Sequence, residues 1–277
     1  MLPSPAMAPA DAANDEPPQA PPDRPGEIQH AEFLGLRFAL LTQRQALHAI
    51  LENTGAPYRY VVTPNAYHVV AAHEDPSRLL PIYRAAWLSL CDSRIIRTLA
   101  RLDRHSLPLV TGSDLVASLF AALNRHDHIC APKRILVVGP SRGTEAALRA
   151  GYPSIDFEVL SAPAGLAQSA ERRLAVARAC MNRTWDIALL CVGCPAQELI
   201  AQALGELGSK SGVALCVGAS IDFLTGVRAR APLWLQKLGL EWAYRLMREP
   251  ARMWRRYLVE SPRILRIFLA HRSPRWR

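Results

Sequence analysis

The sequence has no long uninterrupted apolar run, and this absence excludes integral membrane proteins. A helix that crosses a bilayer needs about 20 apolar residues, whereas the longest clear apolar stretches, such as residues 115–123, are about half that length. The first residues are rich in Pro, Ala and acidic side chains and lack the basic and leucine-rich regions of a signal peptide. We therefore expect a cytoplasmic protein without a membrane-spanning segment.

Cysteine and metal-binding patterns are also scarce. Six cysteines in 277 residues are too few for a disulfide-bonded scaffold. Cys191 and Cys194 form a single C-x-x-C pair, for which we favour a structural role over a redox or zinc site, and we assign no metal to the His126-Asp127-His128 cluster. The sequence has no Asp-x-Asp triplet, the usual carboxylate pair that holds a divalent ion on a nucleotide-sugar diphosphate. We expect no metal ion and no cofactor.

Positive charge is concentrated at the C-terminal end. Residues 228–277 contain thirteen Arg or Lys and three Glu, a net charge of +10, whereas the whole chain carries +9. Such a segment could bind nucleic acid, bind an anionic membrane or form a solvated surface. Nucleic-acid binding would leave the apolar residues of this segment unexplained, and we do not expect it.

These apolar residues follow helical spacing in segments that prolines separate. Pro232, Pro250 and Pro262 stand where short helices could begin. The second helix carries the stripe Met253, Trp254, Tyr257 and Leu258, and the third carries Ile264, Leu265, Ile267, Phe268 and Leu269. Basic amphipathic helices with Trp side chains suit the interface of an anionic membrane. We predict a peripheral protein on the inner face of the cell membrane.

Segments typical of strands and helices alternate through the central part of the chain. Expected strands lie at 58–63, 135–138, 156–160, 186–192 and 213–217, and expected helices at 44–53, 66–74, 144–150, 170–182 and 198–207. This alternation predicts an α/β fold with a Rossmann-like parallel sheet, whose binding crevice lies at the carboxyl ends of the strands.

The composition divides the chain into four parts. Residues 1–25 contain eight prolines and almost no large apolar side chain, so we expect 1–28 to be a disordered tail. An N-terminal α/β part (29–130) and a Rossmann-like part (131–227) follow, and residues 228–277 form a helical membrane-binding appendage.

A glycine-containing loop, residues 139–143, joins an expected strand to an expected helix, a layout that can bind phosphate. It lacks the Lys-Ser/Thr of a P-loop, since Thr144 and Glu145 follow, and it lacks the full G-x-G-x-x-G of a dinucleotide fold. We expect a nucleotide site on this sheet. Gly139 is a candidate to contact it, although the loop could also be a simple turn.

Motifs between about residues 31 and 257 together resemble the WecG/TagA/CpsF glycosyltransferases. They are Tyr60-Val-Val-Thr-Pro-Asn65, Asp92, Thr111-Gly-Ser-Asp-Leu115, Gly193-Cys-Pro-Ala-Gln-Glu198, Val217-Gly-Ala-Ser-Ile-Asp-Phe-Leu-Thr-Gly226, Arg230-Ala-Pro232, Gly239-Leu-Glu-Trp-Ala-Tyr-Arg245 and Glu249-Pro250. The resemblance implies inverting transfer of a sugar, of N-acetylmannosamine type or related, from a UDP-sugar donor to an undecaprenyl-diphosphate-linked acceptor in surface polysaccharide biosynthesis. An oligomeric assembly is compatible with it.

The resemblance also implies catalytic roles. Asp92 matches the proposed general base, which would take the proton of the acceptor hydroxyl as its oxygen attacks the anomeric carbon. Thr63 and Asn65 would line the catalytic pocket. Without the resemblance, Asp92 could instead cap the following helix, and Thr63 and Asn65 could simply form a turn.

Binding roles follow in the same way. Gln197 and Asp222, with Gly139, would contact the donor, although Gln197 could be a solvated residue and Asp222 a helix cap. Diphosphate or lipid headgroup oxygens would be bound by an arginine cluster that could otherwise be a solvated basic face. The cluster comprises Arg245, Arg252, Arg255 and Arg256.

The chain departs from the family pattern inside the site motifs. Ser93 stands where the family usually has Gly, Leu109 where it usually has Arg, and Cys191 and Ala196 where it usually has Gly and Lys. These departures imply either an altered choice of donor or acceptor or a catalytically silent relative that binds lipid-linked sugar or partner enzymes as a scaffold.

Overall fold

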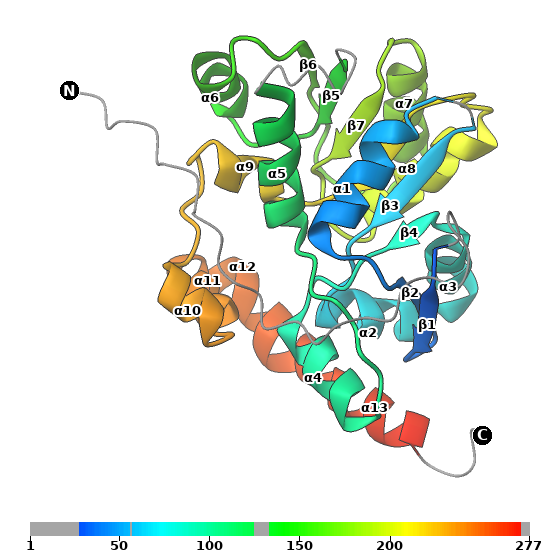
Figure 1. Ribbon diagram of the computed structural model, residues 1–277, viewed down its shortest axis with the longest axis vertical. Helices are drawn as coiled ribbons and strands as arrows, with labels where there is room; N and C mark the ends of the chain where they lie inside the picture. Colours follow the sequence, from blue (N-terminus) through cyan, green and yellow to red (C-terminus); the bar gives the residue numbers. More distant parts are fainter. Residues whose placement is uncertain (1–27, 56, 125–132, 273–277) are drawn as a thin grey trace.

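The fold is built around one parallel sheet. The computed structural model describes residues 28–55, 57–124 and 133–272. Six strands pair in parallel in the order β4-β3-β8-β7-β5-β6 (Figure 1). They are β3 (Arg59–Val62), β4 (Leu88–Ser89), β5 (Ile135–Val138), β6 (Phe157–Leu160), β7 (Ile187–Leu190) and β8 (Val213–Cys216). The predicted α/β fold with a parallel sheet is confirmed.

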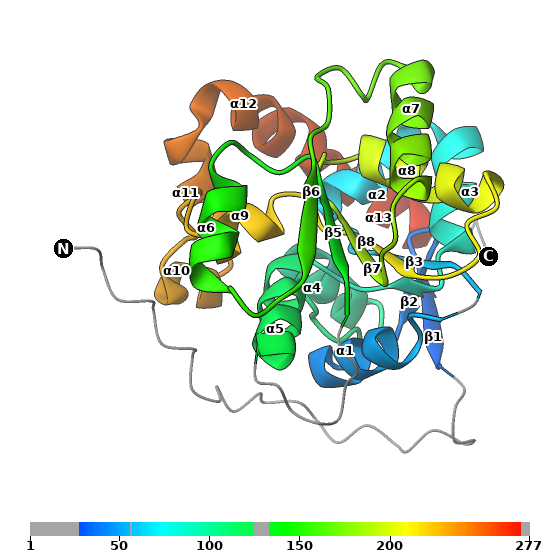
Figure 2. The same ribbon diagram turned by 90° about the horizontal axis from the view of Figure 1, so that it is seen from above.

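Helices cover both faces of this sheet (Figure 2). One face is covered by α2 (Ala66–Glu74), α3 (Pro76–Ala85), α7 (Ala170–Met181) and α8 (Ala196–Glu206), and the other by α1 (Gln43–Glu52), α5 (Gly112–Asn124) and α6 (Thr144–Gly151). α4 (Arg94–Leu102) follows β4, and the short α9 (Ser220–Leu224) follows β8. Side chains alternate between the two faces, so Leu136 and Val138 of β5 pack toward α8 while Ile135 and Val137 pack toward α5.

The sheet passes through both α/β parts that the sequence suggested. β3 and β4 come from residues 29–130, and the other four strands come from residues 131–227. β3 pairs with β8 in a register that places Val62 opposite Cys216. The carboxyl ends of strands from both parts therefore lie along one common edge.

An antiparallel hairpin precedes the sheet and was not expected from the sequence. It consists of β1 (His30–Phe33) and β2 (Leu36–Ala39), joined by Leu34 and Gly35, both with positive φ. Two-residue hairpin turns need this conformation, but Leu rarely adopts it. Leu34 is fully buried in the core, and this burial offsets the unfavourable backbone conformation.

The C-terminal segment is helical, as expected, but it is not divided at each proline. The elements are α10 (Leu233–Lys237), α11 (Glu241–Arg248), α12 (Pro250–Trp254), a π-helix η1 (Arg255–Glu260), a 3₁₀-helix η2 (Ser261–Arg263) and α13 (Ile264–Arg272). Helical backbone continues from 250 to 272, and the break expected at Pro262 is wrong. The π and 3₁₀ turns change the hydrogen-bonding pattern around the proline, which has no N–H to donate.

One side of this segment packs on the core. Met253, Ile264 and Phe268 are buried, and the Phe268 ring lies 6.2 Å from that of Phe33 in the hairpin. The expected assignment of these three residues to a membrane-facing stripe is therefore wrong. These three side chains are removed from water by packing on the protein itself, so they are not available to a membrane.

Two predictions fall outside the described residues. These are the disordered tail, except for Ile28, and the His126-Asp127-His128 cluster. No helix within the described ranges is long and apolar enough to cross a membrane.

Candidate active site

The residues singled out from the sequence lie at the carboxyl edge of the sheet. Thr63 and Asn65 follow β3, and Asp92 follows β4. Gln197 lies in the first turn of α8 after β7, and Asp222 lies in α9 after β8. In a parallel α/β sheet this edge is where ligands bind.

A cavity of about 620 Å³ opens at this edge. Asn65, Asp92 and Arg245 all line it. Side chains from α2, α4, the start of α5 and the C-terminal helices line it. They are Asn65, Ala66, Tyr67, Asp92, Ser93, Arg94, Ile95, Leu109, Thr111, Ser113, Asp114, Arg230, Gln236, Gly239, Glu241, Trp242, Arg245, Tyr257, Leu258, Ser261, Pro262, Ile264 and Leu265. The lining thus combines six charged side chains with apolar and aromatic ones, so the pocket offers both polar contacts and apolar surface to a ligand.

Asp92 has the properties of a base that works near neutral pH. Burial raises the pKa of its carboxyl group to about 7, while the positive charge of Arg245 opposes this rise and Glu241 adds to it. The backbone N–H of Gly112 donates to the carboxyl group. Asp92 does not cap the following helix, because the Ser93 hydroxyl accepts the hydrogen bond of the Ile96 N–H at 3.2 Å. This excludes the helix-cap alternative for Asp92.

The two departures that adjoin the pocket have simple structural outcomes. Ser93 has φ −158°, an extended conformation that any residue adopts, so replacing the family's usual Gly introduces no strain. Leu109 lines the pocket with an apolar side chain. At these two positions the pocket has an unstrained serine and an apolar side chain.

Thr63 and Asn65 have different surroundings. The buried Thr63 hydroxyl donates to the carbonyl oxygen of Cys216 at 2.9 Å and joins the ends of β3 and β8. Asn65 caps α2, with its side-chain oxygen accepting from the Tyr67 N–H at 3.1 Å, and it also lines the cavity. Asn65 is therefore accessible to a ligand in the cavity, whereas Thr63 is buried and links two strands of the sheet.

Asp222 organises the loop 139–143. Its carboxylate accepts from the Ser141 N–H at 3.1 Å, the Ser141 hydroxyl at 2.6 Å and the Thr144 hydroxyl at 2.9 Å. Arg228 forms an ion pair with it at 3.2 Å. Asp222 is 4% exposed, so its partners are protein groups, and it is not a helix cap.

Two further donor candidates are held by protein contacts. Gly139 has φ +67°, and a Cβ added there would come within 2.3 Å of the Val192 side chain, so packing requires glycine at this position. Gln197 is 2% exposed, which makes the solvated alternative wrong, and its side-chain oxygen accepts from the Gly218 N–H at 2.9 Å.

The arginine cluster divides into distinct environments. Arg245 lies over the Phe223 ring at 4.6 Å and pairs with Glu241 at 2.9 Å. Arg256 lies over the ring of Tyr67, a pocket residue, at 4.5 Å.

The other two arginines lie farther along the same helical segment. Arg255 is exposed and pairs with Glu260 at 3.1 Å. Arg252 lies in α12, and its side chain is outside the described residues. Of the three predicted arginines whose side chains are described, Arg245 lines the cavity.

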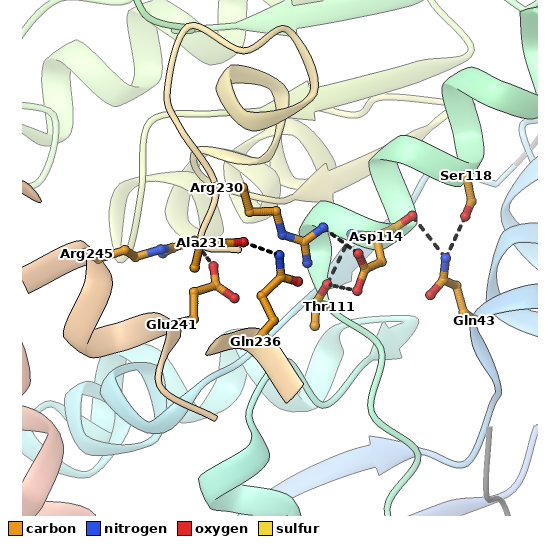
Figure 3. Close-up of polar contacts among 9 residues, drawn as sticks. All are labelled: Gln43, Thr111, Asp114, Ser118, Arg230, Ala231, Gln236, Glu241 and Arg245. Atoms are coloured by element: carbon orange, nitrogen blue, oxygen red, sulfur yellow. Dashed lines mark hydrogen bonds and ion pairs between the residues drawn. The ribbon is translucent and has the colours of Figure 1, made fainter. Parts of the chain in front are cut away.

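A polar network along the pocket wall was not predicted from the sequence. Several of its residues nevertheless belong to the motifs that carry the family resemblance. Arg230 donates to the Asp114 carboxylate at 2.6 Å, and the Thr111 hydroxyl donates to the same carboxylate at 2.7 Å (Figure 3). Gln236 donates to the Ala231 carbonyl at 2.6 Å. These contacts join the start of the C-terminal segment to α5 and close one side of the pocket.

One group of side chains in the described part of the chain has the composition of a metal site. Ligand atoms of His68, Cys194 and Glu198 lie within 4.8 Å of one another. However, His68 Nδ1 accepts the Asn65 N–H at 3.0 Å, so the proton of the neutral imidazole is on Nε2, the nitrogen that faces Glu198. A metal ligand needs that nitrogen free, with the proton on the other. Burial also raises the pKa of the Cys194 thiol, which disfavours the thiolate.

Exposed apolar side chains are concentrated in the C-terminal segment. Of thirteen large hydrophobic residues exposed in the described ranges, ten lie between residues 233 and 272, and Ile95 and Leu102 lie on α4. The ten are Trp234, Leu238, Leu240, Trp242, Met247, Trp254, Leu258, Val259, Leu265 and Leu269. Such concentration is typical of an interaction surface.

The sequence is similar to known glycosyltransferases. The sequence model of the Glycosyl transferase WecG/TagA/CpsF family matches residues 31–277. The chain is also similar to the N-acetylglucosaminyldiphosphoundecaprenol N-acetyl-beta-D-mannosaminyltransferase of Bacillus subtilis (strain 168), with 30% identity over 153 residues, which are 54% of this chain and 55% of that protein. The matched region thus spans about half the length of that relative. Because the family match covers most of the chain, the protein belongs to the WecG/TagA/CpsF family of glycosyltransferases.

Proposed function

We propose that this glycosyltransferase moves a sugar of N-acetylmannosamine type from a UDP-sugar to an undecaprenyl-diphosphate-linked acceptor, with inversion at the anomeric carbon. The observation that carries the proposal is a half-buried carboxyl group, Asp92, with a pKa of about 7, which lines the same pocket as Arg245. The name of the Bacillus subtilis relative, which describes a mannosaminyl transfer to a diphosphoundecaprenol acceptor, supports this choice of substrates.

In the proposed reaction Asp92 accepts the proton of the acceptor hydroxyl. The oxygen forms a bond to the anomeric carbon as the bond to the UDP oxygen breaks on the opposite face, and UDP leaves as the anion. A base whose pKa is close to the working pH is efficient, because it is ionised before the reaction and still accepts a proton during it.

Charge on the two diphosphates would be neutralised by arginines rather than by a metal ion. The Nε atoms of Arg230, Arg245 and Arg256 are buried and lack hydrogen-bond partners in the described structure. Leaving a buried donor unpaired costs about 1–3 kcal/mol, and a phosphate oxygen bound nearby would remove that cost. We expect EDTA to leave the transfer rate within about twofold, since no step is assigned to a cation.

The acceptor would reach the pocket from a membrane surface. Trp242, Leu258 and Leu265 are both pocket-lining and exposed, so the apolar surface is continuous with the cavity. Arginines on the same helices would attract anionic lipids, each contributing about 1 kcal/mol near the surface. The protein would then be peripheral on the inner face of the cell membrane.

The test is release of UDP by the purified protein from a panel of UDP-sugars, with and without an undecaprenyl-type diphosphate acceptor carrying N-acetylglucosamine. We expect release with one or a few donors, and only when the acceptor is present. Absence of release with every donor would support the catalytically silent alternative, and release independent of acceptor would indicate a hydrolase.

A further inference from the structure

Polar side chains lie buried beneath the pocket where packing alone would favour apolar ones. Gln197 and Glu198 in the first turn of α8 are 2% and 1% exposed, and His68 of α2 is 6% exposed. The other buried residues of α8 are Ala196, Ile200, Ala201 and Leu204, all apolar. A buried carboxyl group is costly unless it holds polar partners, so its presence in this helix requires an explanation.

These side chains connect two backbone positions on opposite sides of the site. Glu198 Oε1 accepts from Gln197 Nε2 at 2.9 Å and lies 3.6 Å from His68 Nε2. His68 Nδ1 accepts the Asn65 N–H at 3.0 Å, and Gln197 Oε1 accepts the Gly218 N–H at 2.9 Å. One carboxyl oxygen therefore lies at the centre of a chain of contacts that runs from Asn65 to Gly218.

The direction of the contact between His68 and Glu198 follows from the imidazole. Burial, with the charge of Arg256, lowers the pKa of His68 to about 3, so the ring is neutral near pH 7. Since Nδ1 accepts a hydrogen bond, the single ring proton is on Nε2 and points to Glu198. At 3.6 Å the contact is a polar contact between a neutral ring and the Glu198 carboxyl group, and it is not an ion pair.

The two ends of this chain of contacts, Asn65 and Gly218, lie in different parts of the site. Asn65 lines the cavity beside Asp92. Gly218 opens the loop that leads to α9, where Asp222 holds the loop 139–143. A group shared by both ends sets the spacing between the acceptor side and the donor side, and transfer rates depend steeply on such spacing.

We propose that Glu198 is a positioning residue for the transferase reaction, acting through His68 on Asn65 and through Gln197 on the loop at Gly218. This inference rests on the proposed function, because that function assigns the two sides of the pocket to acceptor and donor. Glu198 itself is buried and touches no substrate in this scheme.

The primary test compares Glu198→Ala with Glu198→Gln. The Ala variant leaves His68 and Gln197 without their shared polar partner, and we expect kcat to fall about 10- to 100-fold, the scale of a small misplacement, with both KM values within about threefold. The Gln variant keeps a side-chain oxygen for both donors and should retain kcat within about threefold of the native protein. Glu206→Ala, an exposed acid at the other end of the same helix, is the matched control.

Amide hydrogen exchange gives a second readout that does not depend on activity. Glu198→Ala should accelerate exchange at the Asn65 and Gly218 amides while leaving Ile200 and Leu204 of α8 protected. A residue that only stabilised the fold would change all four together. If the native protein transfers no sugar, the proposed function fails, and these amides still report whether Glu198 holds the two positions.

A double-mutant cycle isolates the arm through His68. His68→Gln keeps the cap of α2, because Gln is a favoured capping-box partner at this position, and it removes the ring that reaches Glu198. The Glu198→Ala effect on Asn65 exchange should disappear in this background, while the effect on Gly218 should remain. Unchanged exchange at both amides in Glu198→Ala, or equal losses of kcat in the Ala and Gln variants, would overturn the proposal.

Discussion

Arg230 Nη1 and Asp114 Oδ1 lie 2.6 Å apart and tie the start of the C-terminal segment to the first turn of α5 (Figure 3). Because both side chains line the pocket, the same contact also shapes the site.

This pair leads to a prediction about the attachment of the C-terminal helices. Asp114→Ala removes the carboxylate that pairs with Arg230 and should speed amide exchange in α10 and α11 by about 5- to 10-fold, equivalent to the roughly 1 kcal/mol expected for a partly exposed pair. Arg230→Ala should have a similar effect, and the double variant should add little. Additive effects of the two substitutions would contradict a direct coupling.

Asp92→Asn tests the base. The amide keeps the shape of the side chain but accepts no proton, so turnover should fall about 100-fold or more. The variant should bind UDP-sugar as the native protein does, which calorimetry measures. A turnover equal to that of the native protein would eliminate Asp92 as the base.

Asp92→Asn should lower turnover but raise the stability of the folded protein. The pKa of Asp92 is raised from 3.8 to about 7 in the folded protein, so its ionisation disfavours folding increasingly as pH rises between these values. Asp92→Asn should therefore raise the melting temperature at pH 8 by roughly 2–4 °C, for about 1 kcal/mol after allowance for pocket water, and change it little at pH 4. Scanning calorimetry at both pH values would refute this if the gain were larger in acid.

Arg245 should determine the pH at which kcat/KM rises to half its maximum, because it acts on the pKa of Asp92. Its positive charge lowers the pKa of Asp92, so Arg245→Gln should move the half-maximal rate to higher pH. The measurement is kcat/KM between pH 5 and 9. Arg149→Gln, which removes an exposed charge on α6, serves as the control and should leave the midpoint in place.

Membrane attachment is tested best by residues that are exposed and lie outside the pocket lining. Trp234, Met247, Trp254 and Leu269 meet both conditions. Their combined replacement by Ser should lower binding to anionic vesicles more than 100-fold, because each buried apolar side chain contributes about 1.5 kcal/mol or more. Transfer to a short-chain soluble acceptor should persist.

Deletion of residues 251–277 would be a poorer test of attachment. It would also remove Ile264 and Phe268, which pack in the core. If the four-residue variant still pelleted with anionic vesicles at moderate salt, these helices would not be the anchor.

Local patterns in the sequence were sufficient to predict most strands of the sheet. Continuous apolar runs predicted β5 at its observed bounds and β7 and β8 within two residues at each end, because a strand covered on both faces has no polar side. The hairpin at Leu34-Gly35 was missed because its turn lacks the Asn-Gly or Asp-Gly signal. Burial of Leu34 in the core stabilises that turn, and no local pattern reports such burial.

The candidate site was predicted in part. Resemblance of motifs located Asp92, Asn65 and Arg245, which the fold brings to one cavity. It did not reveal that Asp222 and Gln197 are bound by protein groups, because their partners Ser141 and Gly218 come from other loops.

Amphipathic spacing and charge in the sequence determined that the C-terminal segment is helical and basic. The tertiary structure alone decided which apolar residues face the protein. Ile264 and Leu265 are neighbours of equal hydrophobicity, yet one is 2% and the other 52% exposed. The reason is that helix geometry defines two apolar stripes, and only the position of the hairpin at Phe33 selects the stripe that is buried.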